Sequence, residues 1–387
     1  MSGQKVSETK IIKPFNRNKI FLARLLLPFW WLLGALFSRR SSQSETHRNI
    51  LIFDFHLIGD IVLLTPLLKA LREGNPDDRI VLVAGQWAHE ILKGTFWVDA
   101  IIPFSAPWVK YGQGFRGWLE CFRLVRSLRQ KTWDLGIEVR GDVRQILLLA
   151  LSGAKRRVGY DLTGGAPLLT EIIPVDNSLV HLADYNKRIC EYLGVWPHEM
   201  DYIPILQLTE EEIAFTKQVS PYIGLHFGAS LPLKRAPISL ARDIVMNLLT
   251  RRPSCRIVLF NLPEDPDYIP RLLDMIGQEG CVNIEAWSGT LREFIVILSR
   301  CKHLIAMDSA AGHIGAALGR NVTVIFGPTE SKLVKPLGNN VTIVEGLQLH
   351  CKPCNLRYCG EEQIQECMLG LNENIVNSIN EMSLRIS

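Results

Sequence analysis

Polar side chains that could bind or transform a ligand stand in three turns, each directly after an apolar run typical of a buried strand. Ligands of open parallel sheets bind beyond the carboxyl ends of the strands, so these turns are where a site is expected. In the first turn, residues 56–60, Gly59 lets the backbone approach a ligand and Asp60 opens the next helix. The helix dipole favours an ionised carboxylate there, but Asp is also a common helix cap, so ligand binding and capping both stay open.

The second turn, residues 226–230, ends in Ser230 and is followed by Lys234 and Arg235. A loop of small residues with a hydroxyl group and two cations can hold phosphate groups through backbone amides and charge-assisted hydrogen bonds. It is neither a Walker loop nor a dinucleotide fingerprint, because the required glycine spacing and the Lys-Ser or Lys-Thr pair are absent. A phosphate loop and an ordinary surface loop therefore fit this segment equally well.

The third turn places Asp308 and Ser309 at the start of a helix that also contains Gly312 and His313. Backbone amides at a helix N-terminus can bind a diphosphate, the Ser309 hydroxyl can donate to it, and Asp308 can orient a ligand hydroxyl or the loop itself. His313 fits either a ligand contact or a core position. A further small turn follows at residues 327–329, and two phosphate-suited turns in one half of the chain predict a nucleotide site.

The elements around these turns predict two α/β domains. Apolar runs alternate with amphipathic segments, and the pattern restarts after residue 204. Strands separated by helices pair in parallel, so each half should form a doubly wound, Rossmann-like sheet, and the two should face each other across a cleft. The predicted strands are residues 50–55, 80–84, 100–104, 135–139, 157–160, 222–227, 256–260, 303–307 and 322–326. The predicted helices are residues 60–72, 115–130, 143–151, 239–250, 268–277, 291–299 and 312–318, with an acidic helix starting near residue 209.

The length of 387 residues suits two domains and an extension, since a domain usually has about 100 to 200 residues. We expect an arm and linker at residues 1–48, a first domain at 49–208, a second domain at 209–350 and a cysteine-containing segment at 351–387. The last helix, about residues 363–383, should pack back on the first domain.

Charge is distributed unevenly along the chain. The net charge is +4, but the first 48 residues contain nine Lys or Arg against Glu8 and Glu45, a balance of +7 that leaves −3 for the rest. A mildly acidic body is a poor match for nucleic acid, so no nucleic-acid partner is expected. The basic arm instead suits an anionic surface.

The arm contains an apolar run, residues 20–37, with basic residues on both sides. The run is slightly short for a membrane span and contains Arg24 and Pro28, and it lacks a good signal-peptide cleavage site. An interfacial helix with Trp30 and Trp31 at headgroup depth fits best, so we expect peripheral attachment to the inner face of the cytoplasmic membrane. A single-span anchor and a buried packing helix are the alternatives.

Nine cysteines over a long chain do not suggest the disulfide framework of a small secreted domain, so a cytoplasmic location is expected. Four of them cluster at Cys351, Cys354, Cys359 and Cys367. Four thiolates could close a tetrahedral zinc site, although these intervals are not those of a standard finger or ribbon. A structural metal, reduced thiols and local disulfides all stay open.

Taken together and in order, four segments carry a family resemblance. They are Ile58-Gly59-Asp60 with Thr65-Pro66; His226 to Ser230 with Lys234 and Pro237; Asp308-Ser309 to His313 with Ala316-Ala317-Leu318-Gly319; and Phe326-Gly327-Pro328-Thr329. The series resembles glycosyltransferase family 9, the ADP-heptose:lipopolysaccharide heptosyltransferases. The resemblance extends from about residue 49 to 371 and leaves the arm outside.

The resemblance implies a GT-B fold and an inverting transfer of heptose, or a related sugar, to a lipopolysaccharide core or another lipid-linked glycan. The donor would be an ADP-heptose-like nucleotide sugar, with no metal or other cofactor required. Asp60 becomes the candidate general base, and Lys234 the cation that offsets charge on the departing ADP. The other implied donor-site residues are Ser230, Glu264, Asp308, Ser309, Gly312 and His313, and His56 and Gly59 would contact the acceptor.

Some positions depart from the family pattern. Asp54, His56 and Leu57 stand where the family usually has an Arg and small polar residues, Ala236 stands where a Trp is common, and Ala310 replaces a usual Gly. These changes leave a second hypothesis open, a catalytically silent protein that binds a glycan or nucleotide in envelope assembly. A nicotinamide dehydrogenase is disfavoured because no G-x-G-x-x-G motif follows the first predicted strand.

Overall fold

The computed structural model describes residues 47–108, 114–176, 178–196, 201–277, 283–347, 349–354, 359, 365–368 and 371. The chain divides into two compact units, unit 1 with Met1–His89 and Thr95–Tyr202 and unit 2 with Glu90–Gly94 and Ile203–Ser387. The apolar run of the arm and most of the predicted last helix lie outside the described residues. Among the helices that are described, none is long and apolar enough to cross a membrane.

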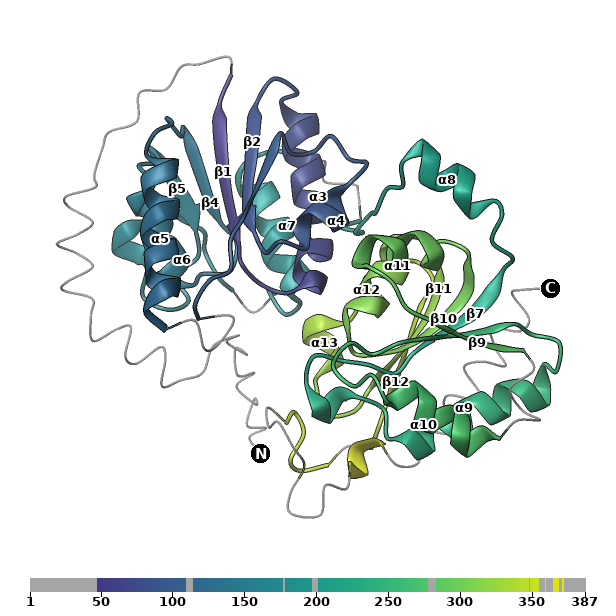
Figure 1. Ribbon diagram of the computed structural model, residues 1–387. Helices are drawn as coiled ribbons and strands as arrows, with labels where there is room; N and C mark the ends of the chain where they lie inside the picture. The colour runs from purple at the N-terminus through teal and green to yellow at the C-terminus, as the bar shows by residue number, and fades with distance from the viewer. Residues whose placement is uncertain are drawn as a thin grey trace, which may run out of the picture. The chain divides into compact units, whose positions relative to one another are not determined.

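Unit 1 is built on a six-stranded sheet with the strand order β3-β2-β1-β4-β5-β6, and all its pairs are parallel. Helices α3 and α7 cover one face and α5 and α6 the other (Figure 1). The order reverses between the neighbours β1 and β4, which is the usual ligand-binding position in such sheets. The strands are β1 (Asn49–Asp54), β2 (Arg79–Ala84), β3 (Ala100–Pro103), β4 (Leu135–Glu138), β5 (Arg156–Gly159) and β6 (Glu171–Ile172). The helices are α3 (Ile58–Gly74), α5 (Gly114–Leu128), α6 (Val143–Leu151), the 3₁₀ turn η1 (Ala166–Leu168) and α7 (Leu182–Tyr192), while α4 (Ala88–Leu92) begins in unit 1 and ends in unit 2.

Helix α3 follows β1 and contains Pro66 in its interior. Proline has no N–H for the carbonyl four residues earlier, which here belongs to Val62. The Thr65 hydroxyl donates to that oxygen at 2.7 Å, and the Asn186 side chain of α7 donates to the Leu63 carbonyl at 3.2 Å. These bonds compensate the interrupted backbone ladder and hold α3 against the rest of unit 1.

Unit 2 has a second six-stranded sheet, with the order β12-β11-β10-β7-β8-β9 and parallel pairs throughout. Helices α9 and α10 cover one face and α11 and α12 the other (Figure 1). Here the order reverses between β7 and β10. The strands are β7 (Tyr222–His226), β8 (Ile257–Phe260), β9 (Ile284–Trp287), β10 (Cys301–Met307), β11 (Asn321–Phe326) and β12 (Val341–Glu345). The helices are α8 (Glu210–Thr216), α9 (Ile238–Arg251), α10 (Tyr268–Ile276), α11 (Leu291–Leu298), α12 (Ala310–Ala317) and α13 (Ser331–Val334), with 3₁₀ turns η2 (Pro232–Lys234) and η4 (Glu366–Met368).

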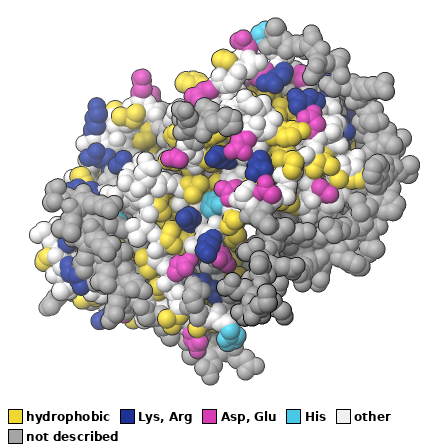
Figure 2. Space-filling view, turned by 180° about the vertical axis from the view of Figure 1, so that it is seen from behind, with side chains coloured by type: hydrophobic (Ala, Val, Ile, Leu, Met, Phe, Trp, Pro, Cys, Tyr) yellow, Lys and Arg dark blue, Asp and Glu magenta, His cyan; other side chains and the backbone are white. Residues whose placement is uncertain are grey.

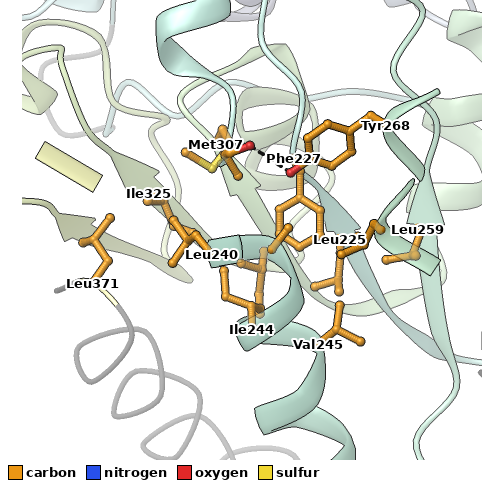
Figure 3. Packing of buried hydrophobic residues seen from close by; sticks show 14 of the residues in the cluster. Leu225, Phe227, Leu240, Ile244, Val245, Leu259, Tyr268, Met307, Ile325 and Leu371 are labelled. Carbon is orange, nitrogen blue, oxygen red and sulfur yellow. Dashed lines mark hydrogen bonds between the residues drawn. The ribbon is translucent and has the colours of Figure 1, made fainter. Parts of the chain in front are cut away.

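The core of unit 2 lies between its sheet and α9, where Leu225 and Phe227 pack with Leu240 and Ile244 (Figure 3). Leu371 joins the same cluster from the end of the described chain. Residues 365–368 approach the sheet closely as well, since a Cβ on Gly346 would lie 1.6 Å from the Cys367 carbonyl oxygen. The described part of the C-terminal segment therefore packs on unit 2.

The predicted class of two doubly wound parallel α/β sheets is confirmed, and each predicted strand matches an observed one within two residues. Three observed strands were not predicted, β6, β9 and β12, and all three lie at sheet edges.

On the face drawn in Figure 2, acidic and basic side chains of the described residues are interspersed.

A buried ion pair joins α8 to α11 within unit 2. Arg292 contacts the Glu212 carboxylate at 2.6 and 2.9 Å and also donates to the carbonyl oxygens of Glu90 and Gln207. The bond from Arg292 is the largest cause that lowers the pKa of Glu212, from 4.5 to about 2. Because one guanidinium satisfies four acceptors, it holds segment 90–94 and α8 in unit 2.

Replacing Arg292 with Met should lower the unfolding free energy at pH 7 by about 3 kcal/mol. The Glu212 carboxylate loses its buried cation and keeps only the 54% exposed Lys93, and the carbonyl oxygens of Glu90 and Gln207 lose their donor. The folded-state pKa of Glu212 lies below the ordinary value, so its stabilisation is complete above about pH 5 and is lost as the pH falls from 4.5 toward 2. Calorimetric unfolding at several pH values measures both effects. The control is Arg271→Met, which removes a 2.8 Å ion pair whose Arg side chain is 57% exposed. Equal effects of the two substitutions would contradict the assignment.

Candidate functional site

Asp60 lies in the first turn of α3, and its carboxylate has two partners. Oδ2 accepts the backbone N–H of Leu57 at 2.9 Å. The helix begins at Ile58 with Leu57 as its N-cap, so Asp60 is the third residue of a capping box and not the N-cap that the sequence allowed. Oδ1 accepts Nη2 of Arg140 at 2.8 Å. The side chain stays 16% exposed. Asp60 is thus held in place by its own helix and by Arg140 from the turn after β4, and it still reaches the surface of unit 1.

Arg140 follows β4 and reaches across the position where the strand order reverses. Its side chain is only 6% exposed, and Nη2 lies 3.5 Å from Oδ2 of Asp54, the last residue of β1. The sequence analysis did not single out Arg140. One signal could have found it, since it follows a predicted strand and therefore lies at the same sheet edge as the turn after β1.

The turn that presents Arg140 is fixed by carboxylates. Glu138, at the end of β4, accepts the backbone N–H groups of Arg140 and Gly141 at 3.1 and 2.5 Å. Gly141 has φ +68°, a conformation that favours glycine. Asp142 then caps α6 by accepting the N–H of Arg144 at 2.9 Å. Burial raises the pKa of Glu138 well above its ordinary value, and the charge of Asp142 raises it further.

Asp54 is fully buried, and its charge depends on two neighbours. Burial alone would raise its pKa, but Arg140 and His56 outweigh burial, so the pKa of Asp54 lies below its ordinary value. His56 Nδ1 lies 3.0 Å from Asp54 Oδ1. The predicted acceptor contact His56 is therefore bound to Asp54 and partly exposed, and the other one, Gly59, lies partly exposed in the first turn of α3. The result is a cluster of two carboxylates around one guanidinium.

Unit 2 brings Lys234 and Asp308 together at the carboxyl edge of its sheet. Lys234 Nζ, from η2, lies 2.9 Å from Asp308 Oδ2. The Thr329 hydroxyl, from the turn after β11, donates to the same oxygen at 2.6 Å. The Lys234 side chain is 16% exposed and that of Asp308 is 6% exposed. The ammonium therefore lies nearer the surface than the carboxylate that holds it.

The start of α12 places the three other residues of the third turn. Ser309 is the N-cap but makes no capping bond with its side chain, and among the described atoms its buried Oγ has no hydrogen-bond partner. A buried hydroxyl without a partner is costly, which suits a group that binds a ligand. Gly312 has a packing role, since a Cβ there would lie 3.0 Å from Val324 and 3.2 Å from Pro336. His313 is buried in the same helix.

Ser230 and Glu264 are exposed in the loops after β7 and β8. Within the described ranges, no hydrogen bond or ion pair joins either of them to Lys234 or Asp308. His226 ends β7 with its ring against Phe294, at 5.9 Å between centroids. Burial lowers the pKa of His226 to about 4, although the charge of Glu264 opposes this, so the ring is neutral at pH 7.

The four clustered cysteines, Cys351, Cys354, Cys359 and Cys367, carry free thiols. In the part of the chain that the structure covers, no group of three or more His, Cys, Asp or Glu could hold a metal ion. The Cys354 N–H donates to the Pro328 carbonyl at 2.7 Å. The cysteine segment therefore runs beside the turn that carries Thr329.

Comparison with known proteins gives consistent matches. The family model for glycosyltransferase family 9 (heptosyltransferase) matches residues 121–365. Lipopolysaccharide heptosyltransferase 2 of Escherichia coli K12 is 25% identical over 314 residues, which cover 76% of this chain and 87% of the relative. Lipooligosaccharide heptosyltransferase 2 of Haemophilus influenzae is 25% identical over 320 residues, which cover 76% of this chain and 88% of the relative.

Two solved structures match both sheets of the chain. The E. coli ADP-heptose lipopolysaccharide heptosyltransferase II is 20% identical, with a TM-score of 0.69, and the match covers 87% of this chain and 99% of that one. A family 9 glycosyltransferase from Veillonella parvula is 18% identical, with a TM-score of 0.71, and the match covers 89% and 100%. These likenesses confirm the predicted GT-B type of fold.

The Arg140 cluster makes a prediction about stability. Arg140→Met should lower the unfolding free energy by about 3 kcal/mol, because the buried Asp54 carboxylate loses its guanidinium partner and keeps only the partly exposed His56. Adding Asp54→Asn to that variant should restore part of the loss. In the Arg140→Met variant, burial should raise the pKa of Asp54, so protonation of Asp54 should stabilise that variant as the pH falls. In the parent protein the pKa of Asp54 is lowered, so protonation of Asp54 has the opposite effect on stability.

Urea unfolding of the four members of this double-mutant cycle at two pH values measures the coupling. Arg157→Met is the matched control, because Arg157 is also buried but donates to the carbonyl oxygens of Leu168 and Ala154. Additive losses for Arg140 and Asp54 would contradict the cluster.

Proposed function

Because the chain belongs to glycosyltransferase family 9, we propose that it transfers heptose, or a related sugar, from an ADP-heptose-like donor to a lipopolysaccharide core or another lipid-linked glycan. The names of the matching relatives support this choice of donor and acceptor class. One observation carries the mechanism. The Asp60 carboxylate is fixed at the carboxyl edge of a parallel sheet, beside a buried guanidinium, and remains partly exposed.

In the proposed reaction, Asp60 acts as the general base. The acceptor hydroxyl oxygen bonds to the anomeric carbon, the bond from that carbon to the phosphate oxygen breaks, and its electron pair leaves with ADP. The hydroxyl proton passes to Asp60. Attack from the side opposite the leaving group inverts the anomeric configuration. Each Asp60 oxygen already accepts one hydrogen bond, and its second lone pair can accept the acceptor hydroxyl.

Lys234 is the proposed partner of the departing diphosphate. Its ammonium has three N–H groups, and one of them meets Asp308. A second can bind a phosphate oxygen and offset the charge that builds up as the bond breaks. Both donors to Asp308 reach Oδ2, and we assign Oδ1 to a hydroxyl of the donor sugar.

The remaining donor contacts are assigned by position. Ser230 donates to the diphosphate, while Ser309, Gly312 and His313 line the diphosphate and sugar at the start of α12. Glu264, in the loop after β8, contacts the nucleoside. In this scheme residues 49–208 bind the acceptor and residues 209–350 the nucleotide sugar. Charge stabilisation by Lys234 and backbone amides requires no metal or other cofactor.

The acceptor's lipid anchor places the reaction at a membrane. We propose that the enzyme works at the inner face of the cytoplasmic membrane, with the basic, apolar arm of residues 1–48 as its attachment. The +7 charge of that arm supports an anionic lipid surface as its partner.

Asp60→Asn should lower kcat by a factor of about 10² to 10⁴, the usual size of a general-base contribution, and should leave ADP binding unchanged. The assay follows ADP release from ADP-heptose with a truncated lipopolysaccharide core, and mass spectrometry identifies the product. Asp184→Asn is a matched control, because Asp184 also lies in a first turn, where it accepts the N–H of His181 at 2.7 Å. An Asp60→Asn enzyme as active as this control would refute the assignment.

Lys234→Met should weaken ADP binding by about tenfold, the value of one charge-assisted contact. Isothermal titration with ADP measures this directly. Lys155→Met serves as the control, because Lys155 forms a 2.8 Å ion pair with Asp134 in unit 1. If both substitutions leave the affinity unchanged, Lys234 does not bind the diphosphate.

A further inference from the structure

Helix α5 is apolar on its solvent side as well as on its core side. Cys121, Leu124 and Leu128 are buried in unit 1. On the other side Trp118 is 60% exposed and Phe122 is 66% exposed. These two aromatic residues are four positions apart, so they are neighbours on the helix surface. Leu119, which is 39% exposed, extends the apolar surface.

Exposed cations accompany these aromatic rings. Residues 116–131 contain Arg116, Arg123, Arg126, Arg129 and Lys131, all exposed, with Glu120 as the one acidic residue. This short segment therefore has a balance of +4, although residues 49–387 as a whole have −3. Arg126 continues the stripe of Trp118 and Phe122 along the helix. Arg116 lies at the N-terminal end of the helix and the other four cations lie in or just beyond its C-terminal half, so cations flank the aromatic residues on both sides.

A series of aromatic ring contacts connects this surface to the turn after β1, next to the Arg140 cluster. Trp118 lies 6.1 Å from Trp108, and Trp108 lies 6.2 Å from Phe55, measured between ring centroids. The Arg144 guanidinium stacks over Trp108 at 5.0 Å. Phe55 directly precedes His56. Packed rings therefore link Trp118 on α5, through Trp108 and the buried Phe55, to the turn after β1.

From this combination we propose that the exposed face of α5 docks on an anionic phospholipid bilayer. Trp118, Leu119 and Phe122 insert at headgroup depth, and the arginines bind lipid phosphates. Aromatic rings flanked by cations are the composition that interfacial helices use. Long Arg side chains can keep their charge in the headgroup layer while their stems cover apolar surface. This contact is separate from the arm and does not depend on the transfer reaction.

Helix α8 also has two exposed apolar side chains, but its charge differs. On α8, Ile213 is 46% exposed and Phe215 is 50% exposed, but Glu210, Glu211 and Glu212 form the first turn of that helix. Carboxylates would repel an anionic bilayer. The α8 residues therefore serve as a control for α5, since they are exposed apolar side chains beside acidic instead of basic residues.

The test is a vesicle partition assay with the full-length chain and no sugar donor. Large vesicles of phosphatidylcholine, with and without about one third phosphatidylglycerol, are titrated and sedimented. Trp118→Ser/Phe122→Ser should reduce the partition coefficient on anionic vesicles by about tenfold or more. Ile213→Ser/Phe215→Ser should leave it unchanged. The arm is identical in all variants, so a difference between their partition coefficients measures the contribution of α5 to vesicle binding.

A variant with fewer cations on α5 tests whether the arginines bind lipid phosphates. Arg123→Gln/Arg126→Gln should weaken binding to anionic vesicles by about tenfold or more and leave binding to neutral vesicles unchanged. This variant keeps the apolar residues of α5, so it still tests the proposal if a thermal melt shows that the serine variant is unfolded. Partition equal to that of the parent protein in both α5 variants would overturn the proposal, as would an equal loss in the α8 control. Neither result depends on whether the enzyme transfers sugar.

Discussion

The ion pairs of the Arg140 guanidinium hold together the carboxyl edge of the unit 1 sheet. The guanidinium lies where the strand order reverses, between a fully buried carboxylate at the end of β1 and a partly exposed one in the first turn of α3. Without this cation, burial would favour the neutral form of Asp54. Asp60 would also lose the hydrogen bond from Arg140 Nη2 that fixes its Oδ1. The cation therefore favours the charged form of Asp54 and fixes the position of the Asp60 carboxylate at the same time. The partly exposed carboxylate of Asp60 can lie close to the buried carboxylate of Asp54 because the two share one cation.

Unit 2 has the same arrangement with the signs exchanged. In unit 1 the cation is the deeper partner, since Arg140 is 6% exposed and Asp60 16%. In unit 2 the carboxylate is the deeper partner, since Asp308 is 6% exposed and Lys234 16%. The group that reaches the surface is thus an anion in one unit and a cation in the other. This matches what glycosyl transfer requires, because a hydroxyl proton needs a base and a departing diphosphate needs a positive charge.

The sequence predicted the central part of each sheet and missed most of the edges. Central strands are buried on both faces and read as continuous apolar runs. In contrast, β9 has no buried side chain, β12 has one, and β6 has only two residues. The turns with Asp60, Lys234 and Asp308 were found because each follows a central strand. Arg140 was missed because a lone Arg after a strand reads as a surface residue, and only the pairing of β4 with β1 brings it to Asp60. The Lys234–Asp308 pair also depends on pairing, of β7 with β10.

The exposed face of α5 bears on how such an enzyme could reach a lipid-linked acceptor. One interfacial contact usually gives weak, reversible membrane binding, and stable attachment takes two. The basic arm and α5 would be two such contacts on one chain, so binding of the first raises the effective concentration of the second. The two contacts would then have different roles. The arm can supply affinity from its +7 charge, while α5, joined through Trp108 and Phe55 to the turn before Asp60, would orient the sheet edge that carries Asp60 toward the lipid.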